Sequence, residues 1–154
     1  PLAQPRHVAQ ALMRTAEDLG APGKDNQFGA GKVQVLDAAM RLFHLVTASD
    51  QTPSIGSSFN IAFDGEAGDF YAALWSLGQG ESPTPVGSID LATPFWILNV
   101  SALDGTGHDD MPITLPNDPG LIGTEVFVQS IEDNSGGTLG AYLFSVVENL
   151  KVKP

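Results

Sequence analysis

The chain has no cysteine among its 154 residues. This absence excludes disulfide bonds and thiolate metal sites. Long apolar runs are also missing, because no stretch approaches the roughly 20 consecutive apolar residues that a membrane-spanning helix needs. The N-terminus lacks the apolar run of a secretory signal, and Pro1 is not an initiating residue. We therefore expect the chain to be a piece of a longer product.

Positive charge is scarce in most of the chain. Residues 1–43 contain five basic and four acidic residues, whereas residues 44–150 contain fourteen acidic residues and no lysine or arginine. Lys151 and Lys153 bring the formal net charge to −11. So acidic a body argues against binding to nucleic acid or to anionic membranes, and it suits a salty exterior where ions screen self-repulsion. The change near residue 43 predicts two parts, 1–43 and 44–154.

The first part has the pattern of a helix. Pro5 suits the first helical position, where its missing N–H would have no partner anyway. Apolar residues then recur at helical spacing, and Gly20 would end the helix. A loop over 21–30, a short strand over 31–35 and a short helix over 36–41 are expected next. The predicted apolar stripe consists of Val8, Ala9, Leu12, Met13, Ala16 and Leu19.

The same part contains the pattern TA-x-D-x-G, followed by a loop and G-x-G-x-V. The residues that match it are Thr15, Ala16, Asp18, Gly20, Gly29, Gly31 and Val33. This spacing, over residues 5–41, resembles the C-terminal end of the subtilisin-like serine peptidase domain. The resemblance implies descent from a subtilase without its activity, because the G-T-S-M-A serine motif and the earlier aspartate and histidine motifs of that family are not in this chain. No catalytic residue is carried over, and we expect the chain not to be an enzyme.

From residue 42 onward the pattern is that of short strands. The segment 70–77 is apolar on both faces, so it could be a strand or a helix, and the close glycine-rich turns favour a strand. Loops are expected at 78–84 and 103–110. Seven or eight strands separated by turns predict a mainly β chain, an antiparallel β-sandwich preceded by a helical and extended arm of subtilase origin. Strands are expected at 42–47, 58–63, 70–77, around 89–91, and at 94–100, 111–115, 123–131 and 139–147.

The stretch 111–131 joins two of these strands through a proline-, asparagine- and glycine-rich turn. The order of strands and loops over residues 50–152, of which this stretch is part, resembles small β-domains that are appended to secreted bacterial proteins. The resemblance implies a structural motif with no activity attached. The residues that carry it are Pro116, Asn117, Asp118, Pro119, Leu121, Gly123 and Gln129.

Polar residues that could do chemistry gather in two predicted turns. His108 followed by Asp109 and Asp110 could serve acid–base catalysis, although a solvated loop is the favoured interpretation. The chain has no G-x-S-x-G nucleophile motif, and His7 and His44 are expected to be structural. Three carboxylates on each turn could bind calcium weakly, but neither turn has EF-hand spacing, so ordinary hydrophilic turns are the favoured interpretation and no cofactor is expected. The calcium candidates are Asp64, Glu66, Asp69, Asp104, Asp109 and Asp110.

Aromatic residues are frequent on the predicted strands. They could line a sugar-binding face, but their strand spacing favours a place in the core. They are Phe70, Tyr71, Trp75, Phe95, Trp96, Tyr142 and Phe144.

These patterns predict a non-catalytic C-terminal accessory part of an extracellular subtilisin-like protein that anchors, presents or binds another protein. One alternative is an extracellular structural subunit that self-assembles into filaments, binding the next copy through the arm or an edge strand. Another is a carbohydrate-binding adhesin module, which would need exposed aromatics. We expect protein partners, including copies of the chain itself.

Overall fold

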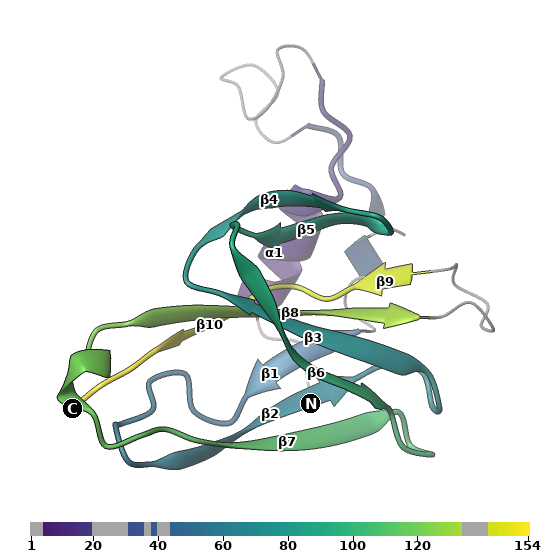
Figure 1. Cartoon of the computed structure of the whole chain (residues 1–154). Helices are drawn as coiled ribbons and strands as arrows, with labels where there is room; N and C mark the ends of the chain where they lie inside the picture. Colours follow the sequence, from purple (N-terminus) through teal and green to yellow (C-terminus); the bar gives the residue numbers. More distant parts are fainter. Residues whose placement is uncertain (1–4, 20–30, 36–37, 40–43, 134–141) are drawn as a thin grey trace.

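The computed structural model describes residues 5–19, 31–35, 38–39, 44–133 and 142–154. These residues form ten strands in antiparallel sheets and little helix, which confirms the predicted mainly β fold, with more strands than the seven or eight expected (Figure 1). The helices are α1 (Pro5–Arg14) and the 3₁₀ turn η1 (Pro119–Leu121). The strands are β1 (Leu45–Ala48), β2 (Ser58–Asp64), β3 (Phe70–Ser76), β4 (Gln79–Thr84), β5 (Gly87–Leu91), β6 (Phe95–Ala102), β7 (His108–Thr114), β8 (Glu125–Asp133), β9 (Tyr142–Phe144) and β10 (Glu148–Lys151).

Two sheets face each other across the main core. One has the strand order β1–β2–β7, and the other has the order β10–β8–β3–β6 with β9 also paired to β8. Strand β2 shows why the sheets adhere: its alternate residues Phe59, Ile61 and Phe63 are buried, as the alternation predicts. The Phe63 ring stacks on Tyr71 of β3 at a centroid distance of 4.5 Å. Apolar burial between the sheets is therefore the main stabilising contact of the sandwich.

A hairpin of β4 and β5 covers part of the outer face of the larger sheet (Figure 1). Ile89 and Leu91 of β5 are fully buried, and they pack with Leu74 and Val147. The prediction of a loop over 78–84 is wrong, because β4 is the hairpin partner of this buried strand. Its glycine, serine and proline content conceals a strand whose position depends on tertiary packing.

Helix α1 begins at Pro5 as predicted, but it ends at Arg14 rather than near Leu19. Beyond it, Glu17 exchanges two backbone hydrogen bonds with Lys32, both of 2.9 Å, which is an isolated bridge and not the strand expected over 31–35. The predicted apolar stripe is only partly right: Leu12 is half-buried and packs on the sandwich, whereas Met13 is 56% exposed. Among the side chains of α1 that the structure describes, the buried one is Ala11. Hydrophobic spacing therefore identified Leu12 but missed Ala11, the small residue that is fully buried.

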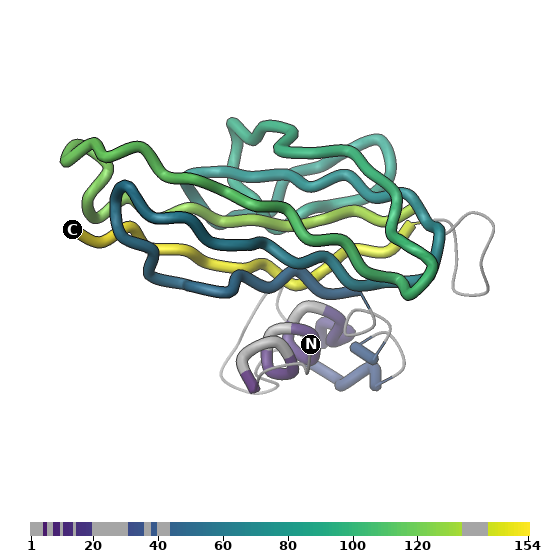
Figure 2. Tube along the Cα trace, turned by 90° about the horizontal axis from the view of Figure 1, so that it is seen from below, coloured from purple at the N-terminus to yellow at the C-terminus, as the bar shows by residue number. Residues whose placement is uncertain are grey.

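Through Ala11 the helix packs on the sandwich of its own chain. Ala11 and Ala38 form a buried cluster with Leu45 of β1 and Val146, which precedes β10. Figure 2 shows α1 at the side of the sandwich where β1 and the segment before β10 lie. The predicted arm is not confirmed as a whole, because the predicted loop 21–30 and most of 36–43 lie outside the described residues.

Two further boundaries differ from the sequence prediction. The predicted loop 103–110 ends early, because residues 108–110 belong to β7 and pair with residues 62–64 of β2. Of the last strand, expected over 139–147, the structure shows only β9 at Tyr142–Phe144; residues 145–147 are not strand, β10 begins after them at Glu148, and residues 139–141 lie outside the described part. Both differences follow from pairing with a distant strand, which local composition does not encode.

Candidate functional site: buried polar networks and an unpaired strand edge

A serine, a histidine and a glutamate form a hydrogen-bonded chain inside the protein. Nδ1 of His44 lies 2.5 Å from Oε2 of Glu132 and 3.1 Å from the backbone oxygen of Asp64. Both atoms only accept hydrogen bonds, so Nδ1 carries a proton. Nε2 of His44 lies 2.8 Å from Oγ of Ser130. This order of groups matches the nucleophile, base and orienting acid of a hydrolase.

Burial keeps this group of three side chains out of reach of a substrate. Ser130, His44 and Glu132 are each 0% exposed. Burial by itself would raise the pKa of Glu132, but the hydrogen bond and charge of His44, with the backbone N–H of Glu66 at 2.8 Å, outweigh it and lower the pKa. Glu132 is thus held as a carboxylate acceptor in the interior, where it joins β8 to the turn after β2. Nothing in the described residues points to catalysis.

The two acidic turns of the sequence analysis lie at one end of the sandwich, next to each other. The backbone N–H of Gly65 donates to the oxygen of Gly107 at 2.9 Å. His108 sits between Asp64, at 2.8 Å from its Nδ1, and Asp110, at 3.4 Å from its Nε2. The hydrogen bond with Asp64 raises the pKa of His108. The predicted His108–Asp109–Asp110 group is therefore part of a strand that ties two turns together.

The other carboxylates of this end already serve the fold. Oδ1 of Asp104 accepts hydrogen bonds from the N–H and hydroxyl of Thr106 and from the N–H of His108, which lower the pKa of Asp104. Asp109 accepts a 2.6 Å bond from the hydroxyl of Tyr71. Glu66 and Asp69 lie in the turn before β3. Within the described residues no three carboxylates or histidines come together in a way that could hold a metal, and calcium binding stays an untested prediction.

The two sheets have four outer edges, and three are covered or carry groups that discourage pairing. Along β10, the N–H of Lys151 donates to the oxygen of Gln51 and the N–H of Lys153 donates to that of Pro53. Strand β1 lies beside β10 and under α1. Strand β7 carries Asp109, Asp110 and Pro112, and charge and proline are the usual protection of an edge.

The fourth edge is β6, which pairs with β3 alone among the described strands. Its eight residues, FWILNVSA, include no charge and no proline, and none of the thirteen residues 91–103 is charged. Ile97 and Val100 are 67% and 61% exposed, and Trp96 is 43% exposed. The sequence predicted an apolar strand here but not that it would be an edge. The register against β3 shifts at Leu98, which is a bulge.

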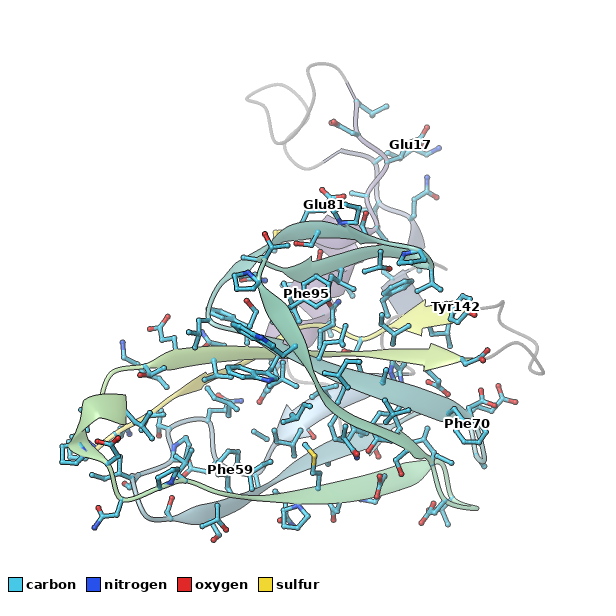
Figure 3. The ribbon with its side chains drawn as sticks, in the orientation of Figure 1. Glu17, Phe59, Phe70, Glu81, Phe95 and Tyr142 are labelled. Atoms are coloured by element: carbon cyan, nitrogen blue, oxygen red, sulfur yellow. The ribbon has the colours of Figure 1, made fainter. Side chains whose placement is uncertain are left out.

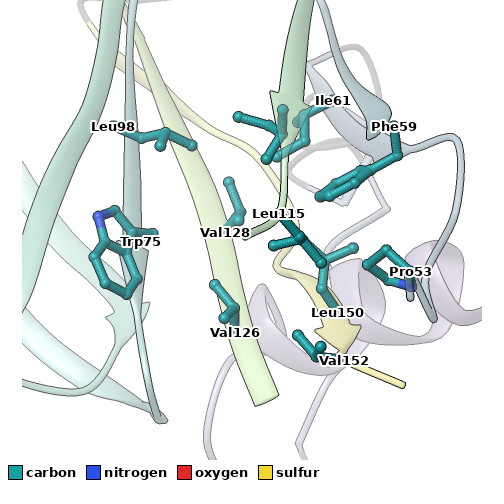
Figure 4. A pocket seen from close by; sticks show the side chains of 11 residues that line it. Pro53, Phe59, Ile61, Trp75, Leu98, Leu115, Val126, Val128, Leu150 and Val152 are labelled. Atoms are coloured by element: carbon teal, nitrogen blue, oxygen red, sulfur yellow. The ribbon is translucent and has the colours of Figure 1, made fainter. Parts of the chain in front are cut away.

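Beneath this edge lies an apolar pocket of about 100 Å³ between the sheets (Figure 4). Trp75 stacks near Trp96 at a centroid distance of 4.8 Å and forms one wall, together with Leu98 of β6. Ile113 and Leu115, which are half-buried, line it from the β7 side. The inner face of the sandwich is therefore incompletely closed beside its unpaired edge.

The aromatic residues divide between core and surface. Tyr71 is buried, and Trp75, Phe95 and Phe144 are half-buried, as expected for core packing. Phe70 and Tyr142 are instead exposed, and Figure 3 places them at the same end of the larger sheet. They lie in register on either side of Asp133, since Phe70 pairs with Asp133 and Asp133 pairs with Tyr142. With Val86 and Val100 these three residues line a depression of about 250 Å³.

Comparisons with known proteins add little. No family model matches the chain, and no curated protein matches it. Among solved structures, the sporulation control protein Spo0M from Bacillus subtilis is similar with a TM-score of 0.34 and 11% identity. The match covers 72% of this chain and 49% of Spo0M, so the chain spans about half of that protein's length. A likeness this low establishes neither a shared fold nor a shared function. None of the helices in the described part is long and apolar enough to cross a membrane.

Proposed function

We propose that this chain is a non-catalytic, extracellular interaction module that anchors or presents a subtilisin-like protein of which it is the C-terminal part. The observation that carries the proposal is strand β6. It offers unpaired backbone groups and exposed Ile97 and Val100 on a body that is otherwise strongly acidic. An unpaired, uncharged edge is the usual acceptor for a strand of another protein.

The buried networks favour binding over catalysis. Among the described residues, Ser130 is the serine that contacts a histidine which in turn contacts a carboxylate, and it is 0% exposed. A substrate carbonyl cannot reach its hydroxyl without opening the sandwich. We expect no labelling of the folded chain by a fluorophosphonate. Labelling that disappears in Ser130→Ala would contradict the non-catalytic part of the proposal.

The interaction part is tested at β6 itself. Ile97 is replaced by the photo-crosslinking residue p-benzoylphenylalanine, and Asn149, an exposed residue of β10, carries the same group as the control. Both variants are irradiated in extracts of the source organism and in the pure state. We expect protein adducts at position 97 that are absent at position 149. Equal adducts at the two positions, or none at position 97, would refute β6 as the binding edge.

A second candidate function is carbohydrate binding at the outer-face depression. Two exposed aromatic rings, Phe70 and Tyr142, lie on either side of Asp133 in this depression and could stack on a sugar ring. The test is affinity electrophoresis in gels that contain neutral polysaccharides. Retardation that is lost in both Phe70→Ala and Tyr142→Ala would support it, and unchanged mobility in every gel would refute it.

A further inference from the structure

We propose that the partner of β6 is a second copy of this chain, bound by antiparallel pairing of the two β6 strands around a two-fold axis. This inference rests on the proposed function, because it names the partner of the same edge. It commits to a closed dimer and not to a filament, since a two-fold contact uses the same surface on both subunits and leaves no further edge of that kind.

Charge favours a second copy over a basic partner. The chain has a formal net charge of −11, so two copies repel each other least where the surface carries no charge. Residues 91–103 provide such a stretch, and β6 lies inside it. A strand rich in lysine would find no carboxylate on β6 to pair with. Like charges placed opposite each other across strands are destabilising, and this edge has none.

The geometry of β6 restricts the register. The bulge at Leu98 interrupts the ladder, which leaves Asn99–Ala102 as the regular end of the strand. In an antiparallel pair, residues that lie opposite each other point to the same face of the sheet. When two copies of β6 pair around a two-fold axis, the residue on the axis lies opposite the same residue of the second copy. Val100 lies in the middle of this regular end and is 61% exposed. We therefore place Val100 opposite Val100 of the second copy, which extends the larger sheet across the dimer.

The size of the contact sets its expected strength. A single short strand pair buries less than the roughly 1,200 Å² of total surface that marks the lower limit of stable interfaces. The dimer therefore belongs to the weak class, and its population should grow with protein concentration. The effect of salt on the association constant distinguishes the two kinds of partner. Salt screens the repulsion between two acidic copies, so it should strengthen the dimer, whereas it would weaken the binding of a basic strand.

The first experiment is sedimentation velocity on the full chain, over a roughly hundred-fold range of concentration at low and high salt. We expect a monomer–dimer equilibrium that shifts toward dimer by roughly ten-fold or more in association constant at high salt. Val100→Lys should give a monomer throughout. Asn149→Lys changes the net charge equally on β10 and should associate at least as well as the unaltered chain. Circular dichroism and thermal melting verify that both variants are folded.

The second experiment traps the register. Because the chain has no cysteine, Val100→Cys introduces a single thiol. Cα atoms of opposed residues lie about 4.5–5.5 Å apart, within the range that a disulfide spans. Under mild oxidation with diamide, we expect covalent dimers from Val100→Cys and far fewer from Asn149→Cys.

Three results would overturn the inference: a monomer at every concentration and salt, a dimer that Val100→Lys leaves intact, or equal trapping at positions 100 and 149. A monomer whose position 97 still crosslinks to a different protein would refute the second copy and retain the proposed function. The absence of adducts at position 97 in both extracts and pure protein would refute both. The two failures are therefore distinguishable.

Discussion

The buried pair of His44 and Glu132 allows a sharp prediction for Glu132→Gln. The substitution keeps the shape of the side chain and one oxygen for the N–H of Glu66. It removes the negative charge and leaves the Nδ1 proton of His44 without its carboxylate at 2.5 Å. Losing a hydrogen bond to a charged group costs about 1.5–3 kcal/mol. We expect the free energy of unfolding to fall by about 3 kcal/mol, at the upper end of this range, because His44 and Glu132 are both fully buried.

The assay is urea denaturation followed by tryptophan fluorescence, with thermal melting as a second probe. A loss of about 3 kcal/mol corresponds to a decrease in Tm of about 6–12 °C for a chain of this length. Glu125→Gln is the matched control, because Glu125 lies on the same strand in an exposed pair with Lys151. It should cost no more than about 1 kcal/mol. A Glu132→Gln variant within about 0.5 kcal/mol of the unaltered chain would refute a stabilising role for the pair.

The same residue predicts a dependence on pH. A folded-state pKa below the unfolded value means that ionised Glu132 contributes stability above the unfolded pKa and loses that contribution as the pH falls through the folded pKa. The unaltered chain should therefore lose stability below about pH 4.5 more steeply than Glu132→Gln does. Parallel pH profiles of the two proteins would contradict this assignment.

Two other predictions concern the end of the sandwich where the turns meet. Gly65→Ala should destabilise the chain by about 1–3 kcal/mol in urea denaturation, because a Cβ at this position would lie 2.3 Å from Oε2 of Glu132. Gly105→Ala is the control, and it should be nearly neutral because open space surrounds Gly105. An NMR titration should give His108 a pKa above its ordinary value of 6.5. The pairing of protonated His108 therefore stabilises the fold below pH 6.5, and this stabilisation is lost as the pH rises through the pKa of the folded state. Asp64→Asn should return the pKa toward its ordinary value, and an unchanged pKa would show that Asp64 is not the cause.

Much of the sandwich could be predicted because alternation is a local signal. Phe59, Ile61 and Phe63 alternate with polar or small neighbours, and the resulting strand and its buried face are confirmed. The hairpin strand β4 could not be found this way, since QGESPT has no apolar alternation and is a strand only through its pairing with β5. For helix α1 the spacing placed Leu12 on the buried face but missed Ala11, because a small side chain contributes little to a hydrophobic pattern.

The candidate site was less predictable than the fold. His44 was expected to be structural, but its partner Glu132 lies 88 positions away and no motif links them. The acidic turns were recognised as clusters, yet only the pairing of β2 with β7 reveals that Asp64 meets His108. The sequence of β6 is apolar on both faces, a pattern that is equally typical of a central strand. Its position at an edge depends on the strand order, and that order follows from long-range pairing.

The central position of β3 also bears on how fast the chain folds. Phe70 pairs with Ala102 on one side and with Asp133 on the other, 32 and 63 positions further along the chain. Each pairing closes a long loop before its contacts can contribute, so the entropic cost precedes the gain. Proteins dominated by such distant pairings fold in milliseconds to seconds rather than microseconds. Until it pairs with β3, the uncharged strand β6 exposes both of its edges, which makes it the segment most prone to aggregate while the chain folds.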